Sequence, residues 1–354
     1  MFVVPSREES SQVIHPVEFY RPPLRAPSFP DSPWLNLYDP TSQNIFHGQV
    51  LLLNFFEFTC INCLRSLPYL RAWHARYESL GFKLFGIHTP EFKFAHDPEV
   101  VKTGLARLGI HWPVMLDNDQ SLWTAYANRY WPSLYLIDHT GKIRYRHTGE
   151  GNYHAIEAKI QELLRAREPE ASMPKLLAPI APEDAESAFC APTSPEIQLG
   201  SIDQIELDLL EPKIFQLPEQ REPDRIYLDG SWRITQDGIT LVSNQGEIGL
   251  RYQAAKVHVV LAPNPDDRER LLFGDEPLYI QVLQDGDPLK RSCFGDDILA
   301  EGTNARFRVE FPRLYSLVEN PGVESHELRL KINLPGLTFY AFSFGSCVAK
   351  ESAP

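Results

Sequence analysis

A proline-rich segment, residues 166–195, separates two parts of the chain that carry different hydrophobic patterns. It contains six prolines, and proline both removes a backbone donor and disfavours helix in the residue before it. Such a segment is expected to be an extended, semi-rigid linker. Because domains usually contain about 100–200 residues, the 354-residue chain is expected to form one domain on each side of the linker.

The first part alternates apolar runs with stretches of helical periodicity. Residues 49–56 are a continuous apolar run, which is typical of a strand buried on both faces. Further strands are predicted at 83–88, 113–116, 133–137 and 142–147, and helices at 63–80, 98–108, 121–129 and 153–167. This alternation predicts an α/β fold in which helices cover both faces of a sheet with parallel strand pairs.

The second part consists of short runs rich in β-branched and aromatic residues, such as KVHVVLA (256–262) and LTFYAFSFG (337–345). Helical periodicity is nearly absent, so the pattern predicts an antiparallel, all-β sandwich of the jelly-roll type. The expected organisation is an N-terminal extension (1–25), an α/β domain (26–168), the linker (169–195) and the β-sandwich (196–350).

Cys60 and Cys63 form a Cys-x-x-Cys pair between a buried strand and the start of a helix. Unpaired N–H groups at a helix N-terminus stabilise a thiolate, and the thiolate is the species that attacks disulfides. Cys63 lies one turn further along the helix, close enough to form a disulfide with Cys60. The pair is therefore predicted to be a redox dithiol.

Two other interpretations of the pair are weaker. A zinc site needs two more ligands at suitable spacing, and no second Cys-x-x-Cys or His-x-x-x-His follows nearby. Two inert buried cysteines are the other alternative, but the strand–Cys-x-x-Cys–helix context favours redox chemistry. The sequence thus predicts neither a metal site nor a bound cofactor.

Several stretches resemble the DipZ group of the TlpA-like thiol-disulfide oxidoreductases, whose redox domain has a thioredoxin-like fold. In the first domain they are FTCINCLRSLPYL (58–70), GIHTPEF (86–92), LDND (116–119), NRYWPSLYLID (128–138) and GEGNY (149–153). In the second, SPEIQLG (194–200), LDGSW (228–232), LRYQAAKVHVVL (250–261) and YAFSFG (340–345) resemble that group's β-sandwich, which is similar to carbohydrate-binding modules. The resemblance covers most of the chain.

The resemblance implies a role for four residues. Cys60 is the nucleophile, Cys63 is the resolving thiol, and Pro132 is a cis-proline that, with Trp131, lies beside the dithiol and leaves a backbone edge for the substrate. The local sequence alone leaves an ordinary trans proline open as an alternative. The implied partners are protein thiols and disulfides, together with an electron donor or acceptor that stays unassigned.

Three polar residues near the dithiol bear on proton transfer. Asn54 stands where simple thioredoxins carry a buried aspartate that helps to deprotonate the resolving thiol, and asparagine cannot act as that base. Glu57 and Glu91 are candidates for tuning a thiol pKa. The alternatives are that Glu57 is solvated at the end of its strand and that Glu91 only anchors its loop.

The net charge of −13 resides entirely in residues 169–354, because residues 1–168 carry 17 basic and 17 acidic side chains. The acidic balance argues against nucleic-acid binding and against docking on an anionic membrane. The carboxylate clusters of residues 169–354 raise the alternative of a calcium site, but solvated acidic side chains are the favoured interpretation.

The β-sandwich offers a second function class, a binding protein that recognises a glycan or a protein and carries a secondary dithiol. Trp232, Tyr252, Tyr279 and Tyr315 are candidates for an aromatic sugar platform, although strand aromatics more often belong to the core. A third class, a peroxiredoxin-like peroxidase, needs threonine three residues before the nucleophile. Here Thr59 directly precedes Cys60.

No stretch reaches the roughly 18 apolar residues of a membrane span, so no membrane insertion is expected. The N-terminal residues lack the basic, apolar and small-residue regions of a secretory signal, which predicts a cytoplasmic protein as written. The resemblance points instead to a site of action outside the cytoplasm. In an oxidising compartment Cys293 and Cys347 can form a disulfide, and Cys190 lies in the linker.

Overall fold

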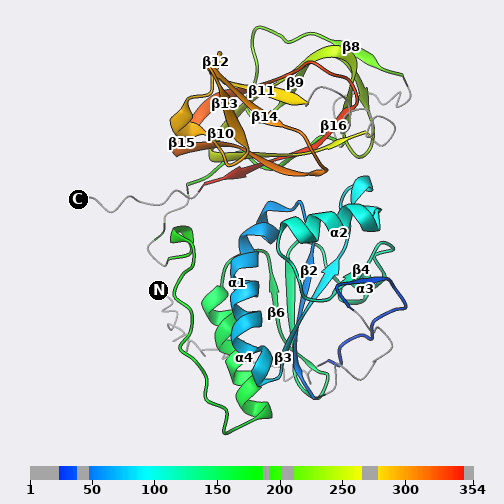
Figure 1. Ribbon diagram of the computed structural model, residues 1–354, viewed down its shortest axis with the longest axis vertical. Coiled ribbons are helices and arrows are strands. Elements are labelled where there is room, and N and C mark those ends of the chain that lie inside the picture. The colour runs from blue at the N-terminus through cyan, green and yellow to red at the C-terminus, as the bar shows by residue number, and fades with distance from the viewer. Residues whose placement is uncertain are drawn as a thin grey trace, which may run out of the picture.

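The computed structural model describes residues 24–37, 48–185, 188, 191–200, 211–264 and 278–346, which form two domains packed on each other (Figure 1). Most of the expected N-terminal extension lies outside the described residues. Cys190 lies outside them as well, as does Cys347, which the sequence offers as a possible disulfide partner of Cys293.

The first domain is built on a six-stranded sheet with the order β1-β4-β3-β2-β5-β6. Strands β2, β3 and β4 are parallel, whereas β1, β5 and β6 pair antiparallel to their neighbours. The strand bounds are β1 Trp34–Leu35, β2 Val50–Phe56, β3 Phe82–His88, β4 Val114–Leu116, β5 Ser133–Ile137 and β6 Ile143–Thr148. Strand β2 is one of the two central strands, as expected for the continuous apolar run, since all seven of its residues are buried.

Helices cover this sheet on both faces (Figure 1). Their bounds are α1 Ile61–Tyr77, α2 Pro98–Arg107, α3 Ser121–Ala125 and α4 Tyr153–Arg167. One core contains Leu52 of β2 with side chains of α1 and α4, and a second core on the opposite face contains Leu53 and Phe55. Successive residues of a strand point to opposite faces, so Asn54 faces the same side as Leu52 and lies towards α1.

The second domain is a ten-stranded antiparallel sheet whose main path is β13-β14-β11-β15-β10-β16-β7. The bounds are β7 Ile197–Gln198, β8 Lys213–Phe215, β9 Ile226–Ile234, β10 Ile239–Pro263, β11 Tyr279–Gln284, β12 Asp287–Pro288, β13 Ile298–Glu301, β14 Asn304–Arg308, β15 Arg313–Ile332 and β16 Leu337–Gly345. The long strands β10 and β15 contain register shifts, which let the sheet bend. This agrees with the predicted sandwich.

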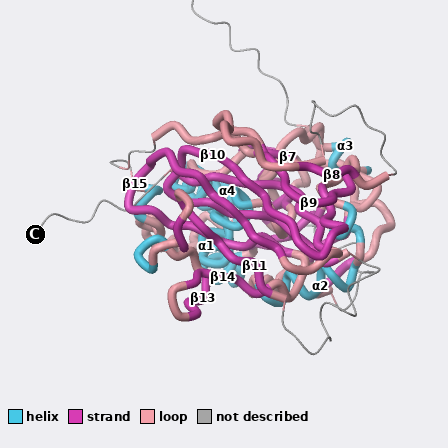
Figure 2. The backbone as a smooth tube through the Cα atoms, turned by 90° about the horizontal axis from the view of Figure 1, so that it is seen from above, coloured by secondary structure: helices cyan, strands magenta, loops and turns pink. Residues whose placement is uncertain are grey.

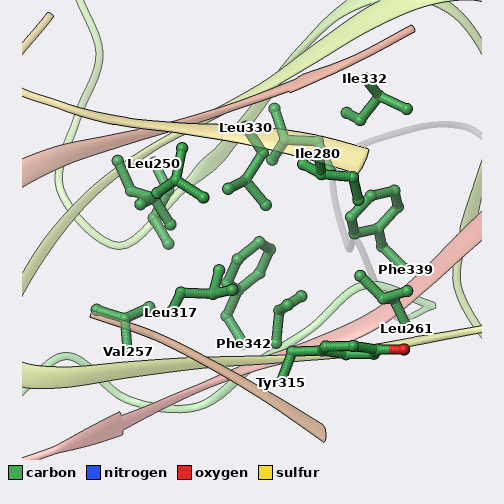
Figure 3. Close-up of a cluster of buried hydrophobic side chains, with 14 of the residues drawn as sticks. Leu250, Val257, Leu261, Ile280, Tyr315, Leu317, Leu330, Ile332, Phe339 and Phe342 are labelled. Carbon is green, nitrogen blue, oxygen red and sulfur yellow. The ribbon is translucent and has the colours of Figure 1, made fainter. Parts of the chain in front are cut away.

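Buried apolar side chains fill the space between the two layers of the β-sandwich (Figure 3). They come from opposite layers and point towards one another, for example Leu250 and Leu330 from one side and Leu317 and Phe342 from the other. Alternation along each strand places these residues inside and leaves the polar ones outside. The core of the predicted all-β domain is therefore enclosed between the two layers.

The linker lies along α1 and α4 rather than standing away from the first domain (Figure 1). Met173 and Leu177 pack against the core of that domain. The Leu177 N–H donates to Glu157 Oε2 at 2.8 Å, and the Ile180 N–H donates to the Tyr69 hydroxyl at 2.7 Å. These bonds occupy backbone donors that are not used by any strand or helix.

The β-sandwich covers the end of the first domain at which α1 begins (Figures 1 and 2). Phe92, in the loop before α2, packs on Tyr340 of β16 with ring centroids 5.1 Å apart, and Phe94 does so at 4.9 Å. Phe311, between β14 and β15, is buried against the core of the first domain. The apolar contact holds one face of the β-sandwich next to the Cys-x-x-Cys pair.

Candidate active site

Cys60 is the N-cap residue of α1, with extended backbone angles (φ −71°, ψ 115°). Its N–H donates to the Glu57 carbonyl at 3.2 Å, and its carbonyl accepts the Leu64 N–H at 3.0 Å. The side chain is half-buried and therefore accessible to a reactant. The first turn of α1 contains no acidic residue that would oppose a negative charge on this sulfur.

Cys63, one turn further along α1, is a thiol with only 1% of its surface exposed. Burial raises the pKa of this thiol well above its usual value, and a hydrogen bond with the Cys60 side chain adds to the rise. The two cysteines are thus unlike: one can meet a reactant, whereas the other is kept protonated inside the domain.

Glu57 lies directly after β2 and is fully buried, with 0% exposed. The predicted alternative of a solvated side chain is wrong, because Thr59 folds back over the carboxylate. The Thr59 N–H donates to Glu57 Oε2 at 2.7 Å, and the Thr59 hydroxyl donates to the same oxygen. A buried carboxylate is tolerated when hydrogen bonds replace its water.

His88, the last residue of β3, is the second buried ionisable group beneath the dithiol. Its Nε2 lies 3.7 Å from Glu57 Oε1, and its ring stacks on Phe58 with centroids 5.6 Å apart. Neither Glu57 Oε1 nor the two ring nitrogens has a hydrogen-bond partner among the described residues. No local pattern marks His88 as a site residue, although it lies in the GIHTPEF stretch that carries the resemblance.

The Trp131–Pro132 peptide bond is cis, as the resemblance implies, so the trans alternative is wrong. The Pro132 carbonyl accepts the Gly149 N–H at 2.8 Å, which ties the start of β5 to the end of β6. The Trp131 ring lies against Trp123 with centroids 4.5 Å apart, so its position is fixed by packing.

A cleft of about 340 Å³ opens beside Cys60 and is lined by both domains. The first domain contributes the dithiol loop, the loop of Glu91 and the loop before the cis-proline, including Thr59, Cys60, Asn62, Glu91 and Trp131. The β-sandwich contributes Glu196, Val260, Ala341 and Ser343. These four residues were not among the predicted site residues, because nothing in the local sequence marks them as neighbours of Cys60.

Glu91 connects the two domains across this cleft. Gln198 Nε2 donates to Glu91 Oε1 at 2.8 Å and to Glu196 Oε1 at 2.9 Å. Burial, followed by the negative charges of Glu57 and Glu196, raises the pKa of the Glu91 carboxyl to about 7, although the bond from Gln198 opposes the rise. Glu91 therefore anchors its loop and also places a titratable carboxyl at the dithiol.

Replacing Glu91 with glutamine is expected to stabilise the protein at pH 8 but not at pH 5. A carboxyl whose pKa is raised in the folded state destabilises that state above this pKa, and the cost disappears as the pH falls towards the unfolded value. The ionised carboxyl lowers the free energy of unfolding by on the order of 2 kcal/mol. In the glutamine variant the hydrogen bond from Gln198 can still form. Thermal unfolding should show a melting temperature about 4–8 °C higher for the variant at pH 8. An equal increase at pH 5 would show that the gain does not come from the charge.

Three of the four aromatic residues considered as a sugar platform in the β-sandwich are closed to a sugar, and one face of the fourth is covered. Trp232, Tyr252 and Tyr315 are fully buried in its core. The guanidinium of Arg306 covers the ring of Tyr279, 3.7 Å from its centroid. A sugar cannot stack on the three buried rings, because stacking needs an open face.

Metal coordination has no candidate in the part of the chain that the structure describes, where no three His, Cys, Asp or Glu side chains come together as a ligand set. Cys293, the third described thiol, is buried in the β-sandwich core rather than near the dithiol.

Comparison with known proteins matches both domains. Residues 26–164 match the Redoxin family, and residues 200–345 match the family described as thioredoxin like C-terminal domain. Protein DipZ of Mycobacterium tuberculosis is 32% identical over 235 residues, which cover 64% of this chain and 33% of DipZ. The chain is a DipZ-like, TlpA-like member of the thioredoxin family.

The DipZ-like chain spans about a third of the length of the DipZ proteins that it matches. Thiol-disulfide oxidoreductase YkuV of Bacillus subtilis is 25% identical over 135 residues, covering 38% of this chain and 90% of YkuV. A solved thiol-disulfide isomerase from Corynebacterium glutamicum is 25% identical, with a TM-score of 0.36, over 39% of this chain and 96% of its own. None of the helices described in the DipZ-like chain is long and apolar enough to cross a membrane.

Proposed function

We propose that this protein is a thiol-disulfide oxidoreductase that acts on protein disulfides through Cys60 and Cys63. The observation that carries the proposal is the unequal exposure of the two thiols at the start of α1, one half-buried beside a cleft and one fully buried. An exposed thiol at a helix N-terminus is suited to attack, and a buried one beside it is suited to resolve the product.

The reaction proceeds in two thiol–disulfide exchanges. The Cys60 thiolate attacks one sulfur of a substrate disulfide, forms a mixed disulfide and releases the other substrate sulfur as a thiolate. Cys63 then loses its proton and attacks Cys60 Sγ, which forms the Cys60–Cys63 disulfide and releases the second substrate thiolate. The substrate gains two electrons and the dithiol loses two, so no cofactor is needed. Run in reverse, the same steps oxidise a substrate dithiol.

Neighbouring residues support these steps. Trp131 and Pro132 hold a substrate segment against Cys60, because Trp131 lines the cleft and the cis bond fixes the chain beside it. Glu57, the buried carboxylate nearest in sequence to the dithiol, accepts the proton of Cys63 in place of the aspartate that Asn54 replaces. An external protein that carries a dithiol or a disulfide returns the Cys60–Cys63 pair to its starting redox state.

For the β-sandwich, we propose a role in partner recognition at the dithiol rather than a separate glycan-binding activity. The support is that four of its residues line the cleft beside Cys60, whereas its candidate sugar-stacking rings are covered. A glycan partner would require a surface other than the one formed by those rings.

Catalysed reduction of insulin by dithiothreitol tests the proposal. The wild-type protein is expected to accelerate the precipitation of the reduced insulin chains, whereas Cys60→Ser is expected to leave the uncatalysed rate. Serine is a favourable N-cap residue, so this variant keeps the start of α1 intact. Acceleration by Cys60→Ser equal to that of wild type would contradict the proposal.

A further inference from the structure

The cleft beside Cys60 has one wall that belongs to the β-sandwich. Ser343 and Ala341 of β16 and Val260 of β10 face it, and Glu196 stands just before β7. The wall is held in place by the packing of Phe92 on Tyr340 next to it. A substrate that reaches the sulfur of Cys60 therefore enters between the domains and contacts both of them.

Two carboxylates face this cleft with few compensating groups. Glu91 and Glu196 share one donor, the Gln198 amide, and Glu196 also accepts the Ser343 hydroxyl at 3.3 Å. Among the described residues, no lysine, arginine or histidine forms an ion pair with either carboxylate. The remaining charged side chain of the lining, Arg129, is exposed, and so is Glu196, so water screens both of these charges and the half-buried Glu91 carries the charge that is screened least.

A half-buried carboxylate interacts more strongly with a nearby charge than a solvated one, because the local dielectric constant is lower. Glu91 is half-buried, and Glu57 lies near enough to add to its negative field. The potential in the cleft therefore opposes an anionic substrate and attracts a cationic one.

Resting on the proposed function, we propose that Glu91 and Glu196 make the cleft selective for disulfides that carry a cationic group, an ammonium or guanidinium, close to the reacting sulfur. In a protein substrate this is a lysine or arginine beside the disulfide-bonded cysteine. The selectivity requires both domains, because Glu91 comes from the redox domain and Glu196 from the segment that opens the β-sandwich.

Three small disulfides of similar size but different charge test this selectivity. Cystamine carries an ammonium group on each half, bis(2-hydroxyethyl) disulfide is neutral, and 3,3′-dithiodipropionate carries carboxylates. The reduced full-length protein is mixed with each, and the second-order rate of its oxidation is followed by tryptophan fluorescence. Each rate is divided by that of dithiothreitol with the same disulfide, which corrects for leaving-group chemistry. The assay is run at pH 8, where Glu91 is mainly ionised.

The corrected rate for cystamine is expected to exceed that for the neutral disulfide by about fivefold to tenfold, and the anionic disulfide is expected to be slowest. Glu91→Gln and Glu196→Gln should each reduce the ratio of the cystamine rate to the neutral-disulfide rate at least twofold. Glu219→Gln is the matched control, since Glu219 is an exposed acid of the same domain that does not line the cleft. It should keep the full preference.

Equal corrected rates for the three disulfides, with rapid oxidation by all of them, would overturn the selectivity and leave the oxidoreductase function intact. A loss of preference in Glu219→Gln as large as in Glu196→Gln would also overturn it, because overall charge would then be the cause. If none of the disulfides oxidised the protein, both the proposed function and the selectivity would fail.

Discussion

Replacing Cys63 with alanine is expected to convert the protein into a trap that holds its substrate through a disulfide at Cys60. The first exchange needs only Cys60, which is half-buried beside the cleft. The second exchange needs the Cys63 sulfur, so the mixed disulfide persists when that sulfur is absent. Alanine is preferable to serine, because Cys63 is buried and alanine brings no additional polar group into that site.

The trap is measured as a covalent complex by mass spectrometry, after reduced protein is mixed with a peptide disulfide and quenched with acid. Wild type should show almost no complex, because Cys63 resolves it, whereas Cys63→Ala should approach one peptide per protein. The double variant Cys60→Ser/Cys63→Ala should form none, which shows that the remaining cysteines are not the site. Cys293→Ala should behave as wild type, since Cys293 is buried in the other domain. Trapping by Cys60→Ser alone would reverse the two roles.

Replacing Glu57 with glutamine is expected to slow the second exchange by about tenfold to hundredfold at pH 7. This factor lies at or below the lower end of the rate acceleration that a general base usually supplies. Burial keeps Cys63 protonated, so its attack needs a proton acceptor inside the domain. Glutamine cannot accept that proton, but its oxygen can still receive the hydrogen bonds of Thr59. The first exchange, at Cys60, is expected to keep its rate.

Oxidation by excess 4,4′-dithiodipyridine separates the two steps, since each exchange releases one equivalent of thiopyridone. In Glu57→Gln only the second phase should be slow, and the difference from wild type should shrink at high pH, where Cys63 ionises unaided. Glu157→Gln is the matched control, because Glu157 is also almost fully buried, in α4, and bonds to Tyr77. A second phase slowed equally by Glu157→Gln, or slowed by the same factor at every pH, would indicate a structural effect instead.

Local patterns predicted most elements of the first domain but not its irregular ones. The apolar run before the dithiol is β2, and the last helical stretch is α4 (Tyr153–Arg167), as predicted. The helix expected at 121–129 ends at Ala125, because Ala127 takes a positive φ of 50° without a glycine to signal it. The short edge strand β1 was missed, since its two residues follow a proline and pair only through β4.

For the β-sandwich, alternation along the runs predicted the fold class but not the fate of its aromatic side chains. Trp232 and Tyr315 are aromatic residues of the kind that form sugar-binding platforms, yet both are fully buried. The burial of Tyr315 depends on the second layer of strands, which closes over it (Figure 3). Sequence alternation tells which residues share a face of a sheet, but not whether another layer covers that face.

The sequence by itself determined the two-domain plan, the position of the dithiol at a helix start and the family resemblance, because each depends on residues adjacent or a few turns apart. Only the tertiary structure decided that Glu57 is buried against His88 and that the β-sandwich forms a wall of the active-site cleft. The bond between Gln198 and Glu91 joins residues 107 positions apart. Such contacts arise from the packing of whole domains, so no local pattern can encode where a carboxylate meets its neighbours or how strongly water screens its charge.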